Sequence, residues 1–320
     1  MQVPSVCSLF GIGETCLRPV FYNGAKNQHV LEASTGATLP MSAAVFYESH
    51  SHTPLCKHAT GEPEEYAAVA AQRGLHGLII TCHNPMPDGF SAHVRMAPEQ
   101  FDEYVDMIAR ARETWAGRVD VRMGLEADYF EGYEPWLEKQ LSSSDFHHVL
   151  GSVHPQIAEF KERYWNDDAF EFQQTYFKLL AQSAETGLFD TLAHPDLIKN
   201  QTADAWCTDK IMSDIKRALD RIARTGVAME LNTSGLNKKI AEMNPFPEML
   251  GEMRARQIPV VIGADAHVPE RVGDRYLDAL DLLSRCGYES VSFFLERQRR
   301  DVPISEAREC LSAAEPAPTS

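Results

Sequence analysis

The sequence predicts an α/β fold in which parallel strands form a barrel, and three observations support this. Short apolar runs alternate with amphipathic segments from Ala43 onward. Such β and α units fold as parallel strands joined by right-handed crossovers. Seven units occur without a glycine-rich dinucleotide fingerprint, which favours a barrel over a doubly wound sheet. The 320 residues, 44% of them hydrophobic, suffice for one large core.

The predicted strands are apolar runs of strand length that end in polar or charged residues. They cover residues 43–49, 76–82, 119–128, 146–154, 188–194, 227–232 and 259–265. The segment YESVSFFLERQ at residues 288–298 is a candidate for one further strand.

The predicted helices lie between these runs, at residues 63–74, 98–116, 132–141, 167–186, 209–225, 245–256 and 274–286. The first has Thr60 or Gly61 as a cap, acidic residues in its first turn and Gly74 as a stop. The second carries Phe101 and Val105 at helical spacing on one face.

The chain divides into three predicted regions. Residues 1–42 are rich in Gly, Ser, Thr and Asn and have weak periodicity, so we interpret them as an N-terminal extension. Residues 43–312 form the barrel, and residues 313–320, rich in Pro and Ala, are predicted to be a disordered tail.

The charge and cysteine content exclude several classes of partner. The net charge of -16 repels phosphate backbones, so a long nucleic-acid partner is not expected. The first residues lack a basic signal-peptide region, and no apolar run is long enough to span a bilayer. Seven cysteines without regular spacing indicate reduced thiols and predict a cytoplasmic protein.

Candidate metal ligands recur where the predicted strands end. In a barrel of this type, functional residues lie at the C-terminal ends of the strands and in the loops that follow. The candidates are His50, His52, His58, His83, Glu126, His154, His194, Asp265 and His267. Any one of them alone would be an ordinary surface or core side chain. Seven of the twelve histidines share these places, which indicates a metal site, whereas His29, His76, His93, His147 and His148 lie elsewhere.

The residue types suit transition metals. Neutral imidazole and carboxylate bind Zn, Mn or Fe, and a carboxylate can bridge two ions. Nine ligands exceed the needs of one ion and match about three ions with open positions for water and substrate.

The motifs resemble those of the polymerase-and-histidinol-phosphatase (PHP) family. The matching segments are HSH at 50–52, CKHA at 56–59, TCHNP at 81–85, GLEADY at 124–129, GSVH at 151–154, AHPDLIK at 193–199 and GADAH at 263–267. The fourth, fifth and sixth of these segments are most similar to the histidinol-phosphate phosphatase branch. Glu48 and Cys82 depart from the family pattern, which often has Asp and an acidic residue at these positions.

The resemblance implies a distorted TIM-like (β/α)7 barrel with three divalent ions. One ion would take His50, His52, Glu126 and Asp265, a second Glu126, His154 and His194, and a third His58, His83 and His267. It also implies phosphomonoester hydrolysis by a water that bridges two ions, with L-histidinol phosphate as the expected substrate. Asp265 and His267 are candidates for serving the leaving group, and Glu126 for bridging the ions.

Substrate contacts are predicted from the loops after the strands. Arg163 and Lys199 are candidate phosphate clamps. Acidic side chains, Asp128 among them, are candidates for pairing with the amine of a small phosphorylated substrate; the others are Asp88, Glu131 and Asp196. Tyr129, Phe130 and Trp165 are candidates for packing against its imidazole.

Several other functions stay open at this point. They are a family phosphoesterase acting on a nucleotide, sugar phosphate or cyclic phosphate, an amidohydrolase, a nuclease or proofreading module, and a non-catalytic metal-binding regulator. The acidic charge argues against the nuclease. An amidohydrolase would typically have a carboxylated Lys on the fourth strand, where this chain has His154.

Overall fold

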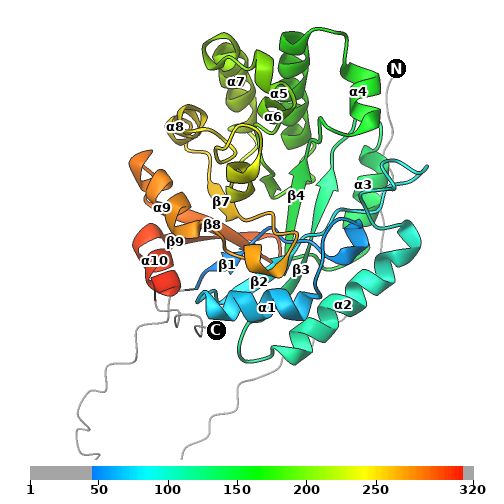
Figure 1. The fold of residues 1–320 in the computed structure, drawn as a ribbon, viewed down its shortest axis with the longest axis vertical. Coiled ribbons are helices and arrows are strands. Elements are labelled where there is room, and N and C mark those ends of the chain that lie inside the picture. Colours follow the sequence, from blue (N-terminus) through cyan, green and yellow to red (C-terminus); the bar gives the residue numbers. More distant parts are fainter. Residues whose placement is uncertain (1–44, 313–320) are drawn as a thin grey trace, which may run out of the picture. The chain divides into compact units, whose positions relative to one another are not determined.

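The computed structural model describes residues 45–312, whose fold is shown in Figure 1. The predicted N-terminal extension at residues 1–42 and the predicted tail at 313–320 lie outside the described residues. Their boundaries therefore stay predictions.

The strands form one sheet of nine strands in sequence order. They are β1 (Tyr47–Glu48), β2 (Gly77–Ile80), β3 (Asp120–Asp128), β4 (His148–Ser152), β5 (Thr191–Leu192), β6 (Ala228–Asn232), β7 (Val260–Gly263), β8 (Ser290–Leu295) and β9 (Gln298–Pro303). Each strand from β1 to β7 pairs in parallel with the next, and β9 pairs antiparallel with β8. The predicted α/β class is confirmed, and each of the eight predicted runs contains one strand.

The first strand also contacts the far end of the sheet. A parallel bridge joins Ser51, just after β1, to Ala266, just after β7. On β1 itself, the ring of Tyr47 stacks on Phe293 of β8 with 4.8 Å between ring centroids. The polar segments that follow β1 and β7 are therefore neighbours, as a barrel requires.

The helices lie outside the strands (Figure 1). They are α1 (Pro63–Gln72), α2 (Phe101–Thr114), α3 (Glu134–Leu141), α4 (Ala158–Tyr164), α5 (Ala169–Glu185), α6 (Ile198–Gln201), α7 (Thr208–Ile222), α8 (Pro247–Ala255), α9 (Tyr276–Arg285) and α10 (Ile304–Ser312). Short 3-10 turns occur at η1 (Pro54–Cys56), η2 (Pro98–Gln100), η3 (Ala203–Ala205), η4 (Thr233–Asn237) and η5 (Pro269–Arg271). The seven predicted helices are present, whereas α4, α6, α10 and β9 were not predicted.

Local sequence explains where several helices begin. Glu62 and Glu65 form a reciprocal capping box at the start of α1, with Pro63 at the first helical position. The Asp168 side chain accepts hydrogen bonds from the backbone N–H groups of Phe170 and Glu171 at the start of α5. These caps satisfy N–H groups that have no partner within the helix.

The strands are buried on both faces, as parallel strands covered by helices must be. Leu78, Ile79 and Ile80 of β2 are fully buried. Gly77 begins β2 because a Cβ atom there would lie 1.9 Å from the ring of Tyr47. Among residues 45–312, we find no helix with the length and apolar content needed to cross a membrane.

Candidate metal centre

All nine predicted ligands come together at the C-terminal ends of the strands. They are supplied by the segments that follow β1, β2, β4, β5 and β7, together with Glu126 near the end of β3. Asn84 donates its backbone N–H to the carbonyl of Glu126, and His52 donates its backbone N–H to the carbonyl of Ala266. These main-chain bonds fix the relative positions of the segments that carry the ligands.

The first group contains His50, His52, Glu126 and Asp265. Oε2 of Glu126 lies 3.5 Å from Nε2 of His50 and 3.6 Å from Nε2 of His52. Oδ1 of Asp265 lies 3.7 Å and 3.2 Å from the same two nitrogens. Two imidazoles and two carboxylates therefore face one another.

The second and third groups adjoin the first. Oε1 of Glu126 lies 3.0 Å from Nε2 of His194 and 3.3 Å from Nε2 of His154. In the third group, Nε2 of His267 lies 2.9 Å from Nε2 of His58. His83 completes the third group, whose ligand atoms lie within 4.8 Å of one another. Glu126 thus contributes one oxygen to each of the first two groups.

The donor atoms fit divalent metal ions. Nε2 of His50, Nδ1 of His83 and Oε2 of Glu126 are buried without a hydrogen-bond partner among the described residues. Buried polar atoms normally have a partner, and cations bound in the first and third groups would supply one. Imidazole nitrogen and carboxylate oxygen are also the ligands that zinc, manganese and iron accept.

Two buried carboxylates orient two of the histidines by contacting the Nδ1 atom of each ring. Oε1 of Glu230 lies 2.7 Å from Nδ1 of His50, and its Oε2 accepts the backbone N–H of His194 at 2.7 Å. Oδ1 of Asp128 lies 2.8 Å from Nδ1 of His154. Because Nδ1 of each ring is held by a carboxylate, its Nε2 atom points toward the candidate metal centre.

Glu230 is a candidate positioning residue that the sequence analysis missed. It lies in the middle of β6 and is fully buried, whereas the sequence analysis considered only residues at the strand ends and in the loops that follow. Gly263 on β7 makes room for it, because a Cβ there would lie 2.0 Å from Oε1 of Glu230. The signal in the sequence was a carboxylate inside the apolar run VAMELN, where an unpaired charge would be strongly unfavourable.

Glu48 and Cys82, the two departures from the family pattern, are fully buried beside the centre. The Glu48 carboxylate accepts backbone N–H groups, including those of His50 at 3.0 Å and Gly273 at 2.6 Å. It therefore stabilises the main chain beneath the ligands.

Two ligand positions have a backbone conformation that L-residues rarely adopt. His194 has φ 29° and Asp265 has φ 50°. Non-glycine residues in this region are strained, and such strain often occurs at functional sites.

Burial and neighbouring charges set the protonation of the ligands in opposite directions. Burial lowers the pKa of His83 to about 4, and burial together with His52 lowers the pKa of His267 to about 2. These rings are neutral at pH 7, the form that binds metals. Burial opposes protonation of His154, but Asp128 and Glu126 raise its pKa to about 10. The surrounding histidines hold the pKa of Glu126 well below its usual value despite burial.

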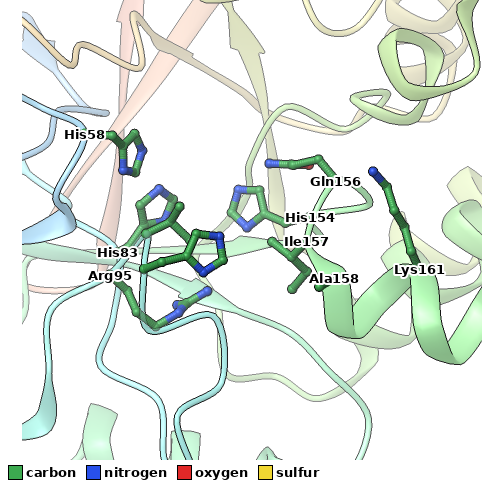
Figure 2. Close-up of a pocket in the computed structure, with 10 residues that line it drawn as sticks. His58, His83, Arg95, His154, Gln156, Ile157, Ala158 and Lys161 are labelled. Atoms are coloured by element: carbon green, nitrogen blue, oxygen red, sulfur yellow. The ribbon is translucent and has the colours of Figure 1, made fainter.

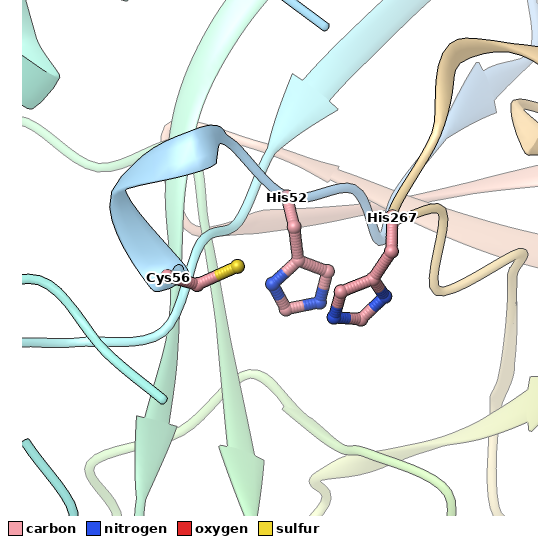
Figure 3. A group of neighbouring side chains, drawn as sticks. All are labelled: His52, Cys56 and His267. Carbon is pink, nitrogen blue, oxygen red and sulfur yellow. The ribbon is translucent and has the colours of Figure 1, made fainter. Parts of the chain in front are cut away.

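Cys56 lies close to His52 at one side of the centre, and the rings of His52 and His267 are stacked 3.9 Å apart (Figure 3). These three residues also form a group whose ligand atoms lie within 4.8 Å of one another. Cys56 and Cys82 are both fully buried.

A pocket of about 390 Å³ adjoins the third group (Figure 2). It is lined by His58, His83, His93, Val94, Arg95, His154, Gln156, Ile157, Ala158 and Lys161. His93, which the sequence analysis placed outside the site, therefore belongs to the pocket wall. No carboxylate is among the described residues that line it.

The predicted substrate-binding residues have other partners in the structure. Arg163 pairs with Glu131, with 3.1 Å between Nη2 and Oε2. Lys199 is fully buried, and its Nζ lies 2.9 Å from Oδ2 of Asp196. Asp128 reaches the centre but pairs with Arg95 at 2.5 Å as well as with His154. The charges of all three predicted residues are thus paired within the protein.

The remaining candidate contacts are also distributed differently from the prediction. Tyr129 and Phe130 are buried, whereas Trp165 is 44% exposed. None of these three aromatic residues, nor Asp88, lines the pocket among the described residues.

Comparisons with known proteins agree with this geometry. A family model described as the PHP domain matches residues 48–234. A probable histidinol-phosphatase of Deinococcus radiodurans is 41% identical over 256 residues, which cover 77% of this chain and 95% of that protein. The histidinol-phosphatase of Bacillus subtilis is 26% identical over 257 residues, which cover 72% of this chain and 96% of that protein.

Two solved structures have a similar fold. The histidinol phosphate phosphatase of Lactococcus lactis, solved with zinc, L-histidinol and phosphate, gives a TM-score of 0.68 at 17% identity and covers 81% of this chain and 99% of its own. A putative histidinol phosphatase of Listeria monocytogenes gives 0.66 at 21% identity and covers 72% of this chain and 99% of its own. The family model and the 41% identical relative show that the chain belongs to the PHP family.

Proposed function

We propose that this protein is a metal-dependent phosphatase that hydrolyses L-histidinol phosphate to L-histidinol and phosphate. The observation that carries the proposal is the convergence of three ligand groups beside a pocket sized for a small molecule. The 41% identity to a probable histidinol-phosphatase supports this substrate.

The nine ligands would hold three divalent ions in the groups described above. When bound, such ions acidify a water molecule and offset the negative charge of the phosphoryl oxygens. Glu126 links the first two groups, and Glu230 and Asp128 orient His50 and His154. Asp265 and His267 are our candidates for serving the leaving oxygen, since their side chains are 11% and 27% exposed and reach solvent.

The basis of substrate selection differs from the sequence-based prediction. Pairing of the substrate amine with acidic side chains was expected, but no carboxylate is among the described pocket-lining residues. Other groups are available instead, including the Gln156 amide, the His93 ring and the apolar Ile157. We therefore assign recognition of the imidazole-bearing end to packing and hydrogen bonds from such groups.

Kinetics across a substrate panel test this function. We expect kcat/KM for histidinol phosphate to exceed that for AMP or a sugar phosphate by at least roughly tenfold, the effect of one specific contact. Phosphate release should be measured side by side with metal-loaded protein, with cyclic phosphates and a cyclic amide included. Preference for a nucleotide or cyclic phosphate would overturn the substrate, and cyclic amide hydrolysis without phosphate release would overturn the reaction.

Metal content is a second test. The three groups predict two to three transition-metal ions per chain after gentle purification or reconstitution, because each group supplies at least three ligand atoms. Elemental analysis measures this ratio. A ratio at or below one ion, even after reconstitution, contradicts the three-ion centre.

A further inference from the structure

The pocket poses an electrostatic problem for a phosphorylated substrate. The chain carries a net charge of -16, which repels a phosphate dianion at long range. A local cation at the mouth of the pocket would offset this repulsion where the substrate enters. Two permanently cationic side chains line the pocket, Arg95 and Lys161.

The guanidinium of Arg95 is already paired with other groups of the protein. It is 2% exposed, its Nη2 lies 2.5 Å from Oδ2 of Asp128, and its Nη1 donates to the carbonyl of Asn84 at 3.0 Å. Its charge is therefore balanced by Asp128, and its role is to support the partner of His154.

Lys161 differs from Arg95 in its exposure and in its ion pairing. It is exposed on α4, and no ion-pair partner is found for it within residues 45–312. In Figure 2, Lys161 and His58 lie at opposite ends of the group of lining residues, so the ammonium is away from the ligand groups. Lys161 is thus an unpaired cation on the rim.

A specific contact holds the two walls of the pocket together. Oε1 of Glu159 on α4 accepts the backbone N–H of Ser91 at 2.7 Å, and its Oε2 accepts the Ser91 hydroxyl at 2.7 Å. Ser91 belongs to the loop that carries His93 and Arg95. The carboxylate two residues before Lys161 is consequently occupied, which leaves the ammonium available to a ligand.

Arg163, two residues further along α4, provides a contrast. Its Nη1 donates to the carbonyl of Glu131 at 2.8 Å, and its guanidinium lies 5.0 Å from the ring centroid of Phe130. Arg163 is not among the pocket-lining residues. The same helix thus presents one paired cation outside the pocket and one unpaired cation on its rim.

We infer that Lys161 recruits the phosphate group of the substrate at the pocket rim, an inference that rests on the proposed phosphatase function. Lys161 acts on capture of the dianion and not on the chemical step, because it lies away from the ligand groups. Lys161 therefore raises kcat/KM and the affinity for phosphate, and both effects weaken as the ionic strength rises.

The test compares Lys161→Met with Arg163→Met, which removes the same charge from the same helix. At low ionic strength, Lys161→Met should lower kcat/KM for histidinol phosphate by roughly three- to tenfold with kcat nearly unchanged, and added salt should reduce the difference. Arg163→Met should stay within about twofold of the parent, since its charge is paired with Glu131. Lys161→Arg should restore most of the loss.

Product inhibition separates the two ends of the substrate. In Lys161→Met, the inhibition constant of inorganic phosphate should rise by a similar factor, whereas that of L-histidinol, a cation, should stay unchanged or fall. Equal effects of the two Met variants, or weaker histidinol binding without weaker phosphate binding, would overturn the role of Lys161. If the parent does not hydrolyse histidinol phosphate, the function fails separately, and p-nitrophenyl phosphate hydrolysis with phosphate inhibition still decides the role of Lys161.

Discussion

Glu126→Gln should abolish phosphatase activity, lowering kcat/KM by at least about a thousandfold, and should reduce bound metal. Its two oxygens lie 2.9 to 3.6 Å from nitrogen atoms of five histidines, so one side chain joins the first two ligand groups. The amide keeps the size of the side chain but loses the charge and the second oxygen that bridging requires. Initial rates and elemental analysis of the same preparation measure both effects.

The matched control is Glu185→Gln. Glu185 is an exposed carboxylate on α5 that pairs with Arg221 and belongs neither to the ligand groups nor to the pocket lining. Its removal should leave rate and metal content unchanged, because exposed ion pairs contribute little. Circular dichroism should show that Glu126→Gln still folds. Near-normal turnover in Glu126→Gln would remove Glu126 from the centre.

Glu230→Gln should weaken metal binding by about ten- to a hundredfold, the usual effect of losing a partner that orients a ligand. Oε1 of Glu230 holds Nδ1 of His50, and its Oε2 holds the main chain at His194, so the substitution disturbs two of the ligand groups. Unlike Glu126→Gln, this variant keeps every ligand. Activity should therefore return as metal is added, and a metal titration of the rate measures the shift.

Glu48→Gln distinguishes positioning from general destabilisation. Glu48 is also fully buried near the end of a strand, but it accepts hydrogen bonds from backbone N–H groups, such as that of Ala264 at 3.0 Å, and from none of the ligand side chains in residues 45–312. Its substitution should lower the free energy of unfolding without moving the metal dependence as far as Glu230→Gln. Identical metal titrations for these two variants would show that Glu230 acts on stability alone.

The barrel could be predicted from the sequence because its strands are buried on both faces and appear as continuous apolar runs. The seven helices between them carry strong amphipathic patterns or caps, as α5 does at Asp168. Three of the four segments that were missed lack such signals, whereas α10 has nine residues. Helix α4 has seven residues, α6 has four, and β9 is mostly exposed, so its sequence QRRDVP lacks the apolar run of the other strands.

The clustering of the nine candidate ligands could be predicted because histidine is scarce and its recurrence at strand ends is a strong signal. The supporting residues could not be identified in this way. Lys161 and Arg163 are both cations in the segment FKERYW, and only tertiary contacts show that Arg163 meets Glu131 while Lys161 meets the pocket. His93 follows no strand directly, and its place in the pocket depends on the folding of a loop.

The left-handed backbone conformations of His194 and Asp265 imply a trade-off between the stability and the activity of this protein. Glycine and asparagine adopt this backbone region with less strain than most residues, and each strained position lowers stability by about 1 kcal/mol or more. Directed evolution that selects only for thermal stability would therefore favour replacements at these two positions. The resulting proteins would be more stable but would lack two of the proposed ligand side chains. Selection for stability in this enzyme must therefore be combined with selection for turnover, because stabilising replacements at His194 and Asp265 are expected to inactivate it.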